Sequence, residues 1–310
     1  MRKTALDMVY ELAKKDKRVI FIGSDLGQGT LDQFKKEMPD RFLMEGISEQ
    51  SIIGMAAGLA LEGKVVYINT IATFLTRRCF DQIVLDLCLH NANVRLIASG
   101  GGFVYAQLGP THQAIDDIGI LRPIPNMTII APADAEEMRR VMLKTIDYQG
   151  PIYIRVAKGG DPIVTKEPFE IGKAVIYKEG ADALIVTTGI TLKIGLDAAE
   201  QLASQKIYAS VLHVPTIKPF DKEALEKYAK EIPIIITIEE HNLIGGLGSA
   251  VAETITEANF SRLKKFKRIG IKDTFAEGYG SQAALLEKYG ITVASLVNSI
   301  EILKENSGVL

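Results

Sequence analysis

The sequence has no tryptophan and only two cysteines, Cys79 and Cys88, among its 310 residues. Two cysteines within one expected helix form neither a disulfide framework nor a metal-binding set. We therefore expect reduced thiols, a cytoplasmic protein and no metal site on this chain.

Long apolar runs are also missing. The longest, residues 52–61, is far shorter than the ~20 residues that a membrane-spanning helix needs. Asp7, Glu11 and several lysines interrupt the N-terminal region, which therefore lacks the apolar core of a secretory signal. The net charge of -2 gives no reason to expect a nucleic-acid or membrane partner.

Short apolar runs rich in β-branched residues alternate with segments of helical spacing. In the first half we expect strands at 19–23, 64–69, 94–98, 127–131 and 152–156, and helices at 49–62, 77–90 and 133–145. Strands that are apolar at nearly every position are typical of a parallel sheet covered by helices on both faces. The pattern predicts a doubly wound α/β domain over residues 1–157.

Periodicity fails over residues 158–173, which are rich in glycine, proline and charge and are expected to be a linker. The alternation then resumes, with expected strands at 183–188, 209–213, 234–238 and 267–271, and helices at 191–204, 222–230, 248–258 and 281–289. The sequence therefore predicts a second, smaller α/β domain over residues 174–310.

Two segments of the first half place charged or aromatic residues at the start of expected helices. Glu49 begins a helix rich in glycine and alanine, where the helix dipole favours a carboxylate. A solvated charge in the first turn explains it as well. Phe74 leads into Arg77 and Arg78, which core packing and solvated charge also explain.

Two further segments are rich in glycine. Gly100, Gly101 and Gly102 follow an expected strand and permit either close approach of a ligand or a flexible turn. Residues 239–241 (E-E-H) and 245–249 (G-G-L-G-S) lie between an expected strand and helix. They do not match a nucleotide-binding loop, so we expect a close-packed turn there.

Together and in this order, these segments resemble the transketolase family, which includes 1-deoxyxylulose-5-phosphate synthases and two-chain transketolases. The resemblance spans nearly the whole chain, and its motifs are G-I-S-E-Q (46–50), T-F-L (73–75), P-T-H-Q (110–113), P-A-D-x-x-E (132–137) and E-E-H with G-G-L-G-S-A (239–250). It implies the C-terminal subunit of a split transketolase, with a pyrimidine-binding domain followed by the family's C-terminal domain.

The resemblance implies thiamine diphosphate as the cofactor, which carries out carbon–carbon cleavage while the protein orients it. It makes Glu49 the catalytic acid that hydrogen-bonds the aminopyrimidine ring and Phe74 the aromatic that stacks on this ring. Asp25 and Arg78 are the other cofactor-binding residues that it implies, and His112 is the catalytic residue that contacts substrate oxygens.

The resemblance also suggests how the substrate is recognised. Arg2 and Lys158 match positions that bind the substrate phosphate. Leu108, Gly100 and Gly101, however, replace polar residues that contact the sugar or its phosphate in many relatives. Because the loss of a polar site group changes substrate preference more than fold, we expect substrates other than the standard pentose phosphates.

No G-D-G sequence, the start of the family's metal-binding motif, occurs anywhere in the chain. Since the sequence begins with Met, we expect the missing module, with Mg²⁺ or Ca²⁺ and the diphosphate site, on a separate N-terminal subunit. The cofactor would then lie between subunits, and two such heterodimers are expected to pair into an α2β2 assembly.

The function that the resemblance favours is transfer of a two-carbon ketol unit from a ketose, which we expect to be phosphorylated, to an aldose. The alternative within the cofactor class is the beta subunit of a 2-oxo-acid dehydrogenase or a pyruvate-decarboxylating synthase. A non-catalytic, partner-binding relative is least favoured, because Glu49 is present.

Overall fold

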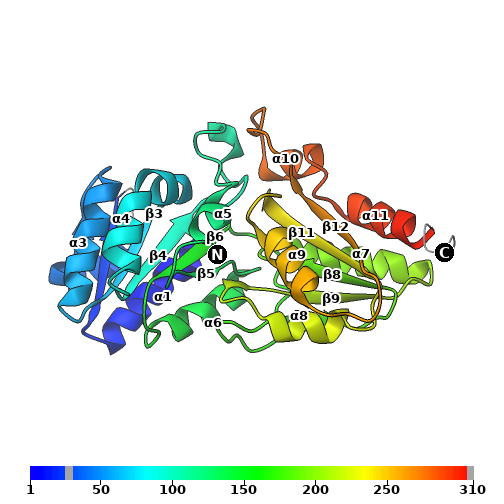
Figure 1. The fold of residues 1–310 in the computed structure, drawn as a ribbon. Helices are drawn as coiled ribbons and strands as arrows, with labels where there is room; N and C mark the ends of the chain where they lie inside the picture. Colours follow the sequence, from blue (N-terminus) through cyan, green and yellow to red (C-terminus); the bar gives the residue numbers. More distant parts are fainter. Residues whose placement is uncertain (25–30, 306–310) are drawn as a thin grey trace.

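The computed structural model describes residues 1–24 and 31–305, which form two α/β domains side by side (Figure 1). The elements of the first half are α1 (Arg2–Lys15), β1 (Val19–Gly23), α2 (Asp32–Glu37), η1 (Pro39–Arg41), β2 (Phe42–Met44), α3 (Glu49–Leu61), β3 (Val65–Ile71), η2 (Phe74–Arg78), α4 (Phe80–Gln82), η3 (Ile83–Cys88), β4 (Val94–Ser99), η4 (Ala106–Leu108), α5 (Asp117–Leu121), β5 (Thr128–Ile130), α6 (Ala135–Thr145) and β6 (Ile152–Val156).

The elements of the second half are β7 (Val175–Lys178), β8 (Ala183–Thr187), α7 (Thr191–Ser204), β9 (Ala209–His213), β10 (Thr216–Lys218), α8 (Lys222–Ala229), β11 (Ile234–Asn242), α9 (Leu247–Glu257), β12 (Lys265–Ile271), α10 (Gln282–Lys288) and α11 (Val293–Glu305). Among the described residues, no helix is both long and apolar enough to cross a membrane.

The first domain is built on a seven-stranded sheet in the order β10-β5-β6-β4-β3-β1-β2, parallel except for β10. Successive residues of its strands face opposite sides. Ile20 and Ile22 join the core beneath α3, whereas Val19 and Phe21 join the core beneath α1 and α6. Both faces are therefore covered, which is why these strands are apolar at most positions.

The second domain is built on a five-stranded sheet in the order β12-β11-β8-β9-β7. Its strands are parallel except β7, a half-buried edge strand that runs antiparallel to β9. Leu184 and Val186 face one core, and Ala183 and Ile185 face the other. The prediction of two doubly wound, mainly parallel α/β domains is confirmed.

One strand joins the two halves of the sequence. β10 follows β9 of the second sheet, but it pairs with β5 of the first, with Thr216 opposite Ile130. The sequence pattern did not predict this strand, because three residues are too few to show an alternation. The first sheet therefore contains a strand from beyond the expected linker.

The single regular helix expected at 77–90 is wrong. The structure has two π-helical turns there, η2 and η3, separated by the short helix α4. A π-turn contains an extra residue, and such turns frequently lie at functional sites. Cys79 and Cys88, which we expected in one helix, are both free and buried.

Candidate active site

The predicted cofactor-binding residues follow the strands β1, β2 and β3 of the first sheet. The chain leaves β1 toward β2 on one side, whereas it leaves β3 toward β4 on the other. Ligands of open α/β sheets bind beyond the carboxyl ends of strands at such a point of divergence. Glu49 follows β2 and Phe74 follows β3, while Asp25, which follows β1, lies outside the described residues.

Glu49 is the first residue of α3, and its carboxylate is buried, with a side-chain exposure of 2%. The Nη1 atom of Arg78 donates a hydrogen bond of 2.6 Å to Glu49 Oε2. Together with the N-terminal end of α3, this cation stabilises the negative charge of the carboxylate. Arg78 is itself partly exposed, at 42% of its side chain.

Phe74 connects Arg78 to His112. The guanidinium carbon of Arg78 lies 4.2 Å from the centroid of the Phe74 ring. The His112 ring meets Phe74 edge-on, with the ring centroids 5.1 Å apart. The structure therefore brings together four of the predicted site residues, and we call Glu49, Phe74, Arg78 and His112 the Glu49 cluster.

Arg77 fixes the segment that carries His112. Its Nη2 atom donates to Asp116 Oδ1 at 2.8 Å and to the carbonyl oxygen of Gln113 at 3.2 Å. From the sequence, Arg77 was expected only as a solvated charge. Nothing in the sequence pairs it with Asp116, which lies 39 residues further along the chain.

Cys79 lies directly behind the Glu49 cluster. Burial, and next the negative charge of Glu49, raise the pKa of the Cys79 thiol to about 12. Because the thiolate is the nucleophilic form of cysteine, Cys79 is a packing residue at neutral pH. The acid–base groups of this cluster are therefore Glu49 and His112.

The two predicted phosphate-binding residues are each next in sequence to a residue at the N-terminus of α1. Gly159 lies close to the start of α1, because a Cβ placed on it would lie 3.2 Å from the Met1 nitrogen. Lys158, which is exposed, is the residue before Gly159. Arg2 is partly buried, and its Nε atom has no hydrogen-bond partner among the described residues. No hydrogen bond or ion pair joins Arg2 or Lys158 to the Glu49 cluster within residues 1–24 and 31–305.

The triple glycine is neither an open ligand loop nor a flexible turn. Cβ atoms built on Gly100, Gly101 and Gly102 would lie 2.2 Å from Tyr105, 2.6 Å from Arg155 and 2.2 Å from Glu240. The glycines therefore make room for side chains of the protein itself. Both of the alternatives that the sequence left open are replaced by a packing role.

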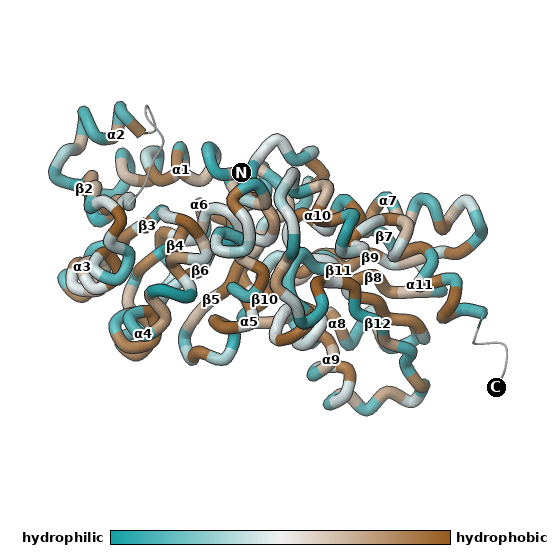
Figure 2. Tube along the Cα trace, turned by 90° about the horizontal axis from the view of Figure 1, so that it is seen from above, coloured by the Kyte–Doolittle hydropathy of each residue, from teal (hydrophilic) through white to brown (hydrophobic). Residues whose placement is uncertain are grey.

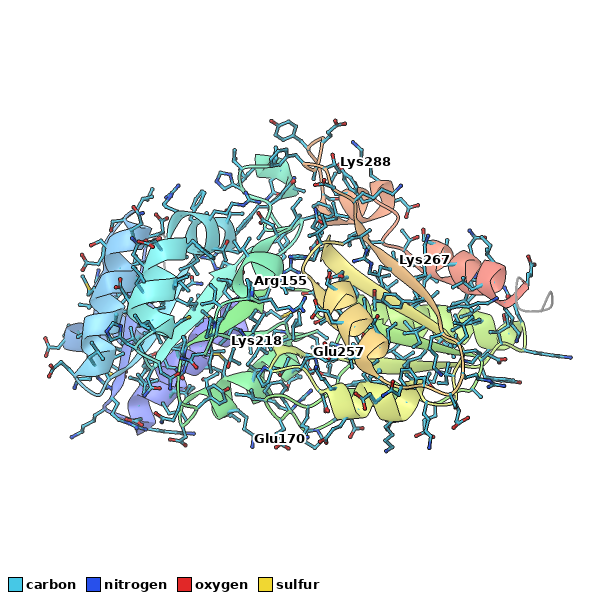
Figure 3. The ribbon with its side chains drawn as sticks, viewed as in Figure 1. Arg155, Glu170, Lys218, Glu257, Lys267 and Lys288 are labelled. Carbon is cyan, nitrogen blue, oxygen red and sulfur yellow. The ribbon has the colours of Figure 1, made fainter. Side chains whose placement is uncertain are left out.

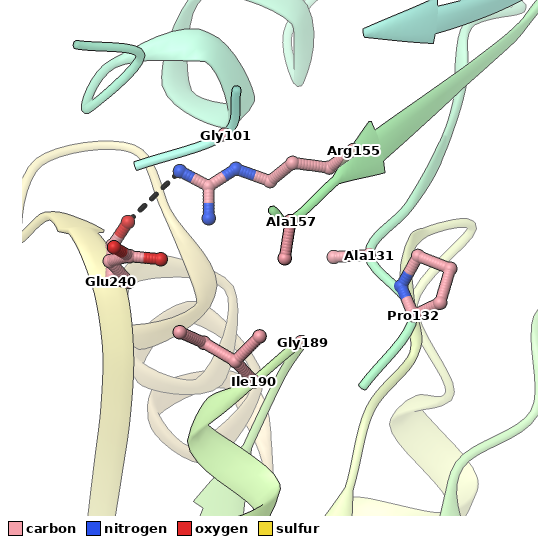
Figure 4. Close-up of a pocket in the computed structure, with 8 residues that line it drawn as sticks. All are labelled: Gly101, Ala131, Pro132, Arg155, Ala157, Gly189, Ile190 and Glu240. Carbon is pink, nitrogen blue, oxygen red and sulfur yellow. Dashed lines mark hydrogen bonds between the residues drawn. The ribbon is translucent and has the colours of Figure 1, made fainter. Parts of the chain in front are cut away.

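Arg155 lies between the two domains (Figure 3), and it forms a buried polar network with Glu240. Arg155 donates to Asp117 Oδ2 at 2.8 Å and to the carbonyl oxygen of Glu240 at 2.9 Å (Figure 4). Tyr153 donates to the same Asp117 oxygen at 2.7 Å. Although burial alone would raise the pKa of Asp117, the Arg155 guanidinium holds it below its usual range.

The Glu240 side chain joins three segments of this network. Its Oε1 atom accepts hydrogen bonds of 2.8 Å from the Phe103 amide and from Gln282 Nε2. Burial raises the pKa of Glu240 to about 7, against the opposing effect of Arg155. A small hollow beside Arg155 and Glu240 is lined by no residue of the Glu49 cluster, so it is a feature of the domain junction.

The turn after β11 is close-packed, as predicted. Glu239 is buried, and its two carboxylate oxygens accept the amides of Leu247 and Gly248 at 2.7 Å, which caps α9. A Cβ on Gly246 would lie 2.0 Å from Glu239 Oε2. This turn therefore serves the structure of the second domain.

The Glu49 cluster fits a flat, nitrogen-bearing ring. The guanidinium of Arg78 is itself planar; it donates an N–H to Glu49 and covers a face of Phe74. An aminopyrimidine ring has the same flat shape and the same kind of donor. The same fit is not found for a metal ion, because the described part of the chain contains no group of three or more metal-ligating side chains.

Two protein-family models match the chain. Residues 1–160 match the pyrimidine-binding domain of transketolases, and residues 172–296 match the transketolase C-terminal domain. Together these models cover both domains of the structure. They agree with the family that the sequence motifs resemble.

The chain is similar to proteins that are themselves single subunits. It is 36% identical over 308 residues to the 6-deoxy-6-sulfo-D-fructose transketolase subunit SqwH of Clostridium sp. (strain MSTE9), covering 98% of this chain and 94% of the relative. It is 39% identical to an apulose-4-phosphate transketolase subunit of Phocaeicola vulgatus, covering 83% of each chain.

A solved structure has the same fold over nearly the same length. It is described as a split gene transketolase in an inactive beta4 tetramer; it is 36% identical, with a TM-score of 0.89, and the match covers 97% of this chain and 96% of that one. The two domains therefore have the arrangement of a known split subunit.

Proposed function

This chain belongs to the transketolase family, and on that premise we propose that it is the ring-binding subunit of a two-chain transketolase that uses thiamine diphosphate. The observation that carries the proposal is the position of the Arg78 guanidinium between Glu49 Oε2 and the face of Phe74. A flat nitrogen-bearing group already occupies the place that the aminopyrimidine ring would take.

In the proposed reaction the donor ketose loses a two-carbon ketol unit and leaves as an aldose. An acceptor aldose gains the unit through a new carbon–carbon bond at its aldehyde carbon. Thiamine diphosphate, when bound, supplies the cleavage chemistry. Every atom of both sugars is accounted for, and no oxidant or reductant is needed.

The residues of this chain would orient the ring and handle protons. Glu49 would share a proton with a ring nitrogen through Oε2, the atom that now accepts from Arg78. Phe74 would hold the ring by stacking, and Arg78 would move off the Phe74 face as the ring binds. His112, at the edge of Phe74, would donate to or accept from the substrate oxygens.

A separate N-terminal subunit is proposed to supply the diphosphate and metal site. Exposed apolar side chains lie beside α3 and on or beside α4 and η3, namely Met44, Ile47, Phe80, Leu85 and Leu89. Figure 2 shows hydrophobic segments around α4 at the outer edge of the first domain. Such a patch next to an incomplete site suits the face that meets the partner.

We propose a heterotetramer of two such pairs in the cytoplasm, with sugar substrates that end in an anionic group. The two relatives are named for a sulfo sugar and a sugar phosphate. Arg2 and Lys158, whose sequence neighbours Met1 and Gly159 lie close together, would meet the anionic end.

The test is reconstitution with a candidate N-terminal subunit, a transketolase chain that carries the G-D-G motif, assayed with hydroxypyruvate, xylulose 5-phosphate and pyruvate. We expect ketol transfer to an aldose, and a reduction of at least about 100-fold in kcat for Glu49→Ala. Glu62→Ala, at the exposed far end of the same helix, is the matched control.

Pyruvate as the best substrate would favour the decarboxylating alternative, and full activity of Glu49→Ala would refute the role of Glu49. Circular dichroism of each variant would show that the fold is kept.

A further inference from the structure

The loop between β12 and α10, residues 272–281, brings the second domain to the segment that carries His112. In Figure 1 this orange loop rises beside the green turn around η4. The loop is fixed two residues before Tyr279, where the Glu277 amide donates to Tyr289 Oη at 2.7 Å and Lys288 Nζ donates to the Glu277 carbonyl at 2.9 Å. Its tip is therefore held in place.

Tyr279, at the tip of this loop, contacts the first domain at Gly109. A Cβ on Gly109 would lie 2.8 Å from Tyr279 Cε1 and 3.3 Å from Tyr279 Oη, and Gly109 has a φ of +76°. The Gly109 carbonyl accepts the His112 amide at 3.0 Å. The tyrosine ring thus lies against the turn that places His112 beside Phe74.

Tyr279 nevertheless remains 74% exposed, and Leu108, next to Gly109, is 48% exposed. A tyrosine ring held at its edge offers a flat apolar face for the C–H groups of a sugar and a hydroxyl for hydrogen bonding. Packing within the chain uses little of this surface. Within this chain, the exposed face of the ring is therefore available to a ligand that reaches the turn at Gly109.

Resting on the proposed function, we propose that Tyr279 is a specificity-determining residue that contacts the aldose portion of the sugar. The reacting carbons would lie at the Glu49 cluster, near His112, and the rest of the sugar would extend from there toward Tyr279. The aldose that leaves the donor and the aldose that enters as acceptor would occupy the same place. The reason is that transfer of the ketol unit to the acceptor is the chemical reverse of its cleavage from the donor. The second domain would thus help to select the acceptor.

Hydroxypyruvate separates this role from a general loss of activity. It gives up its ketol unit with release of carbon dioxide and leaves no aldose, so its reaction does not involve the Tyr279 contact. The reconstituted wild-type pair, Tyr279→Ala and Tyr208→Ala would be compared. Tyr208 is a matched control, being 56% exposed and located in the second domain before β9.

For Tyr279→Ala we expect kcat/KM for aldose acceptors to fall about tenfold, with a larger loss for longer aldoses. The single-turnover release of carbon dioxide from hydroxypyruvate should stay within about twofold of wild type. Unchanged acceptor kinetics would overturn the inference. An equal loss in carbon dioxide release would also overturn it, because Tyr279 would then act by positioning His112.

Failure of the proposed function gives a different result. In that case the wild-type pair itself would transfer no ketol unit to any aldose, and the inference would be overturned together with it.

Discussion

Arg78 binds Glu49 and Phe74 at the same time: its Nη1 atom lies 2.6 Å from Glu49 Oε2, and its guanidinium carbon lies 4.2 Å from the centroid of the Phe74 ring. These are the two groups proposed to hold the cofactor ring. In this structure Arg78 therefore covers the proposed ring site, and a cofactor ring that bound there would have to displace it.

We predict that Arg78→Met lowers the concentration of thiamine diphosphate that half-saturates the reconstituted pair by about fivefold. This corresponds to ~1 kcal/mol, the scale of one partly exposed ion pair and cation–π contact. Activity measured against cofactor concentration tests it, with Phe74→Leu as the opposite control that raises this concentration. A rise for Arg78→Met would instead show that Arg78 holds the bound ring, the role that the sequence resemblance gave it.

The isolated chain should bind thiamine diphosphate weakly even in the presence of Mg²⁺. Glu49 and Phe74 are proposed to hold only the ring of the cofactor, and the described residues contain no cluster of three or more metal-ligating side chains that could hold a metal for its diphosphate. We predict no binding of micromolar or higher affinity to the lone chain by calorimetry, and clear binding once the N-terminal subunit is added. A micromolar site on the lone chain would contradict the split-site proposal.

Much of the fold could be predicted because strands that are buried on both faces of a sheet appear in the sequence as short apolar runs. The apolar runs that form β1, β4 and β6 lie within one residue of where they were expected. β2 and β10 have three residues each, and β7 is a half-buried edge strand. Such strands depend on neighbours distant in sequence, so the local pattern does not show them.

Part of the candidate site could be predicted because family motifs, and not burial, identify its residues. Glu49, Phe74 and His112 were found through family motifs, and the structure brings them into one cluster with Arg78. The contact of Tyr279 with Gly109 has no motif, since the two residues come from different domains. No spacing along the chain indicates such a contact.

Gly102 should be essential for docking of the two domains. Its φ is +61°, and a Cβ there would lie 2.2 Å from the carboxyl carbon of Glu240. We predict that Gly102→Ala lowers the free energy of unfolding by about 2 kcal/mol or more, measured by urea denaturation.

The matched control for that variant is Gly58→Ala. Gly58 lies within α3, where no heavy atom would come within 4 Å of a Cβ. Alanine should stabilise this helix by roughly 0.5–1 kcal/mol. Equal, small effects of the two substitutions would contradict the packing role of Gly102.

Glu240 should make the stability of the chain depend on pH between about 4.5 and 7. Burial raises its pKa in the folded protein from 4.5 to about 7, so the folded state holds the proton more tightly than the unfolded state. The stabilisation from this group is therefore complete below pH 4.5 and is lost as the pH rises through 7.

We predict that the Glu240→Gln variant does not lose this stability as the pH rises. The amide oxygen of glutamine still accepts hydrogen bonds from Phe103 and Gln282, but the amide does not ionise. The stability of the variant minus that of wild type should increase by up to about 3 kcal/mol from pH 4.5 to 7.5, measured by urea denaturation. Asp117 and Asp134, whose pKa values are lowered, give the opposite slope in both proteins, so the difference isolates Glu240. Glu62→Gln, which removes an exposed carboxylate, should run parallel to wild type. If the pH dependence of Glu240→Gln also runs parallel to that of wild type, Glu240 does not titrate in this range and the raised pKa assigned to it is wrong.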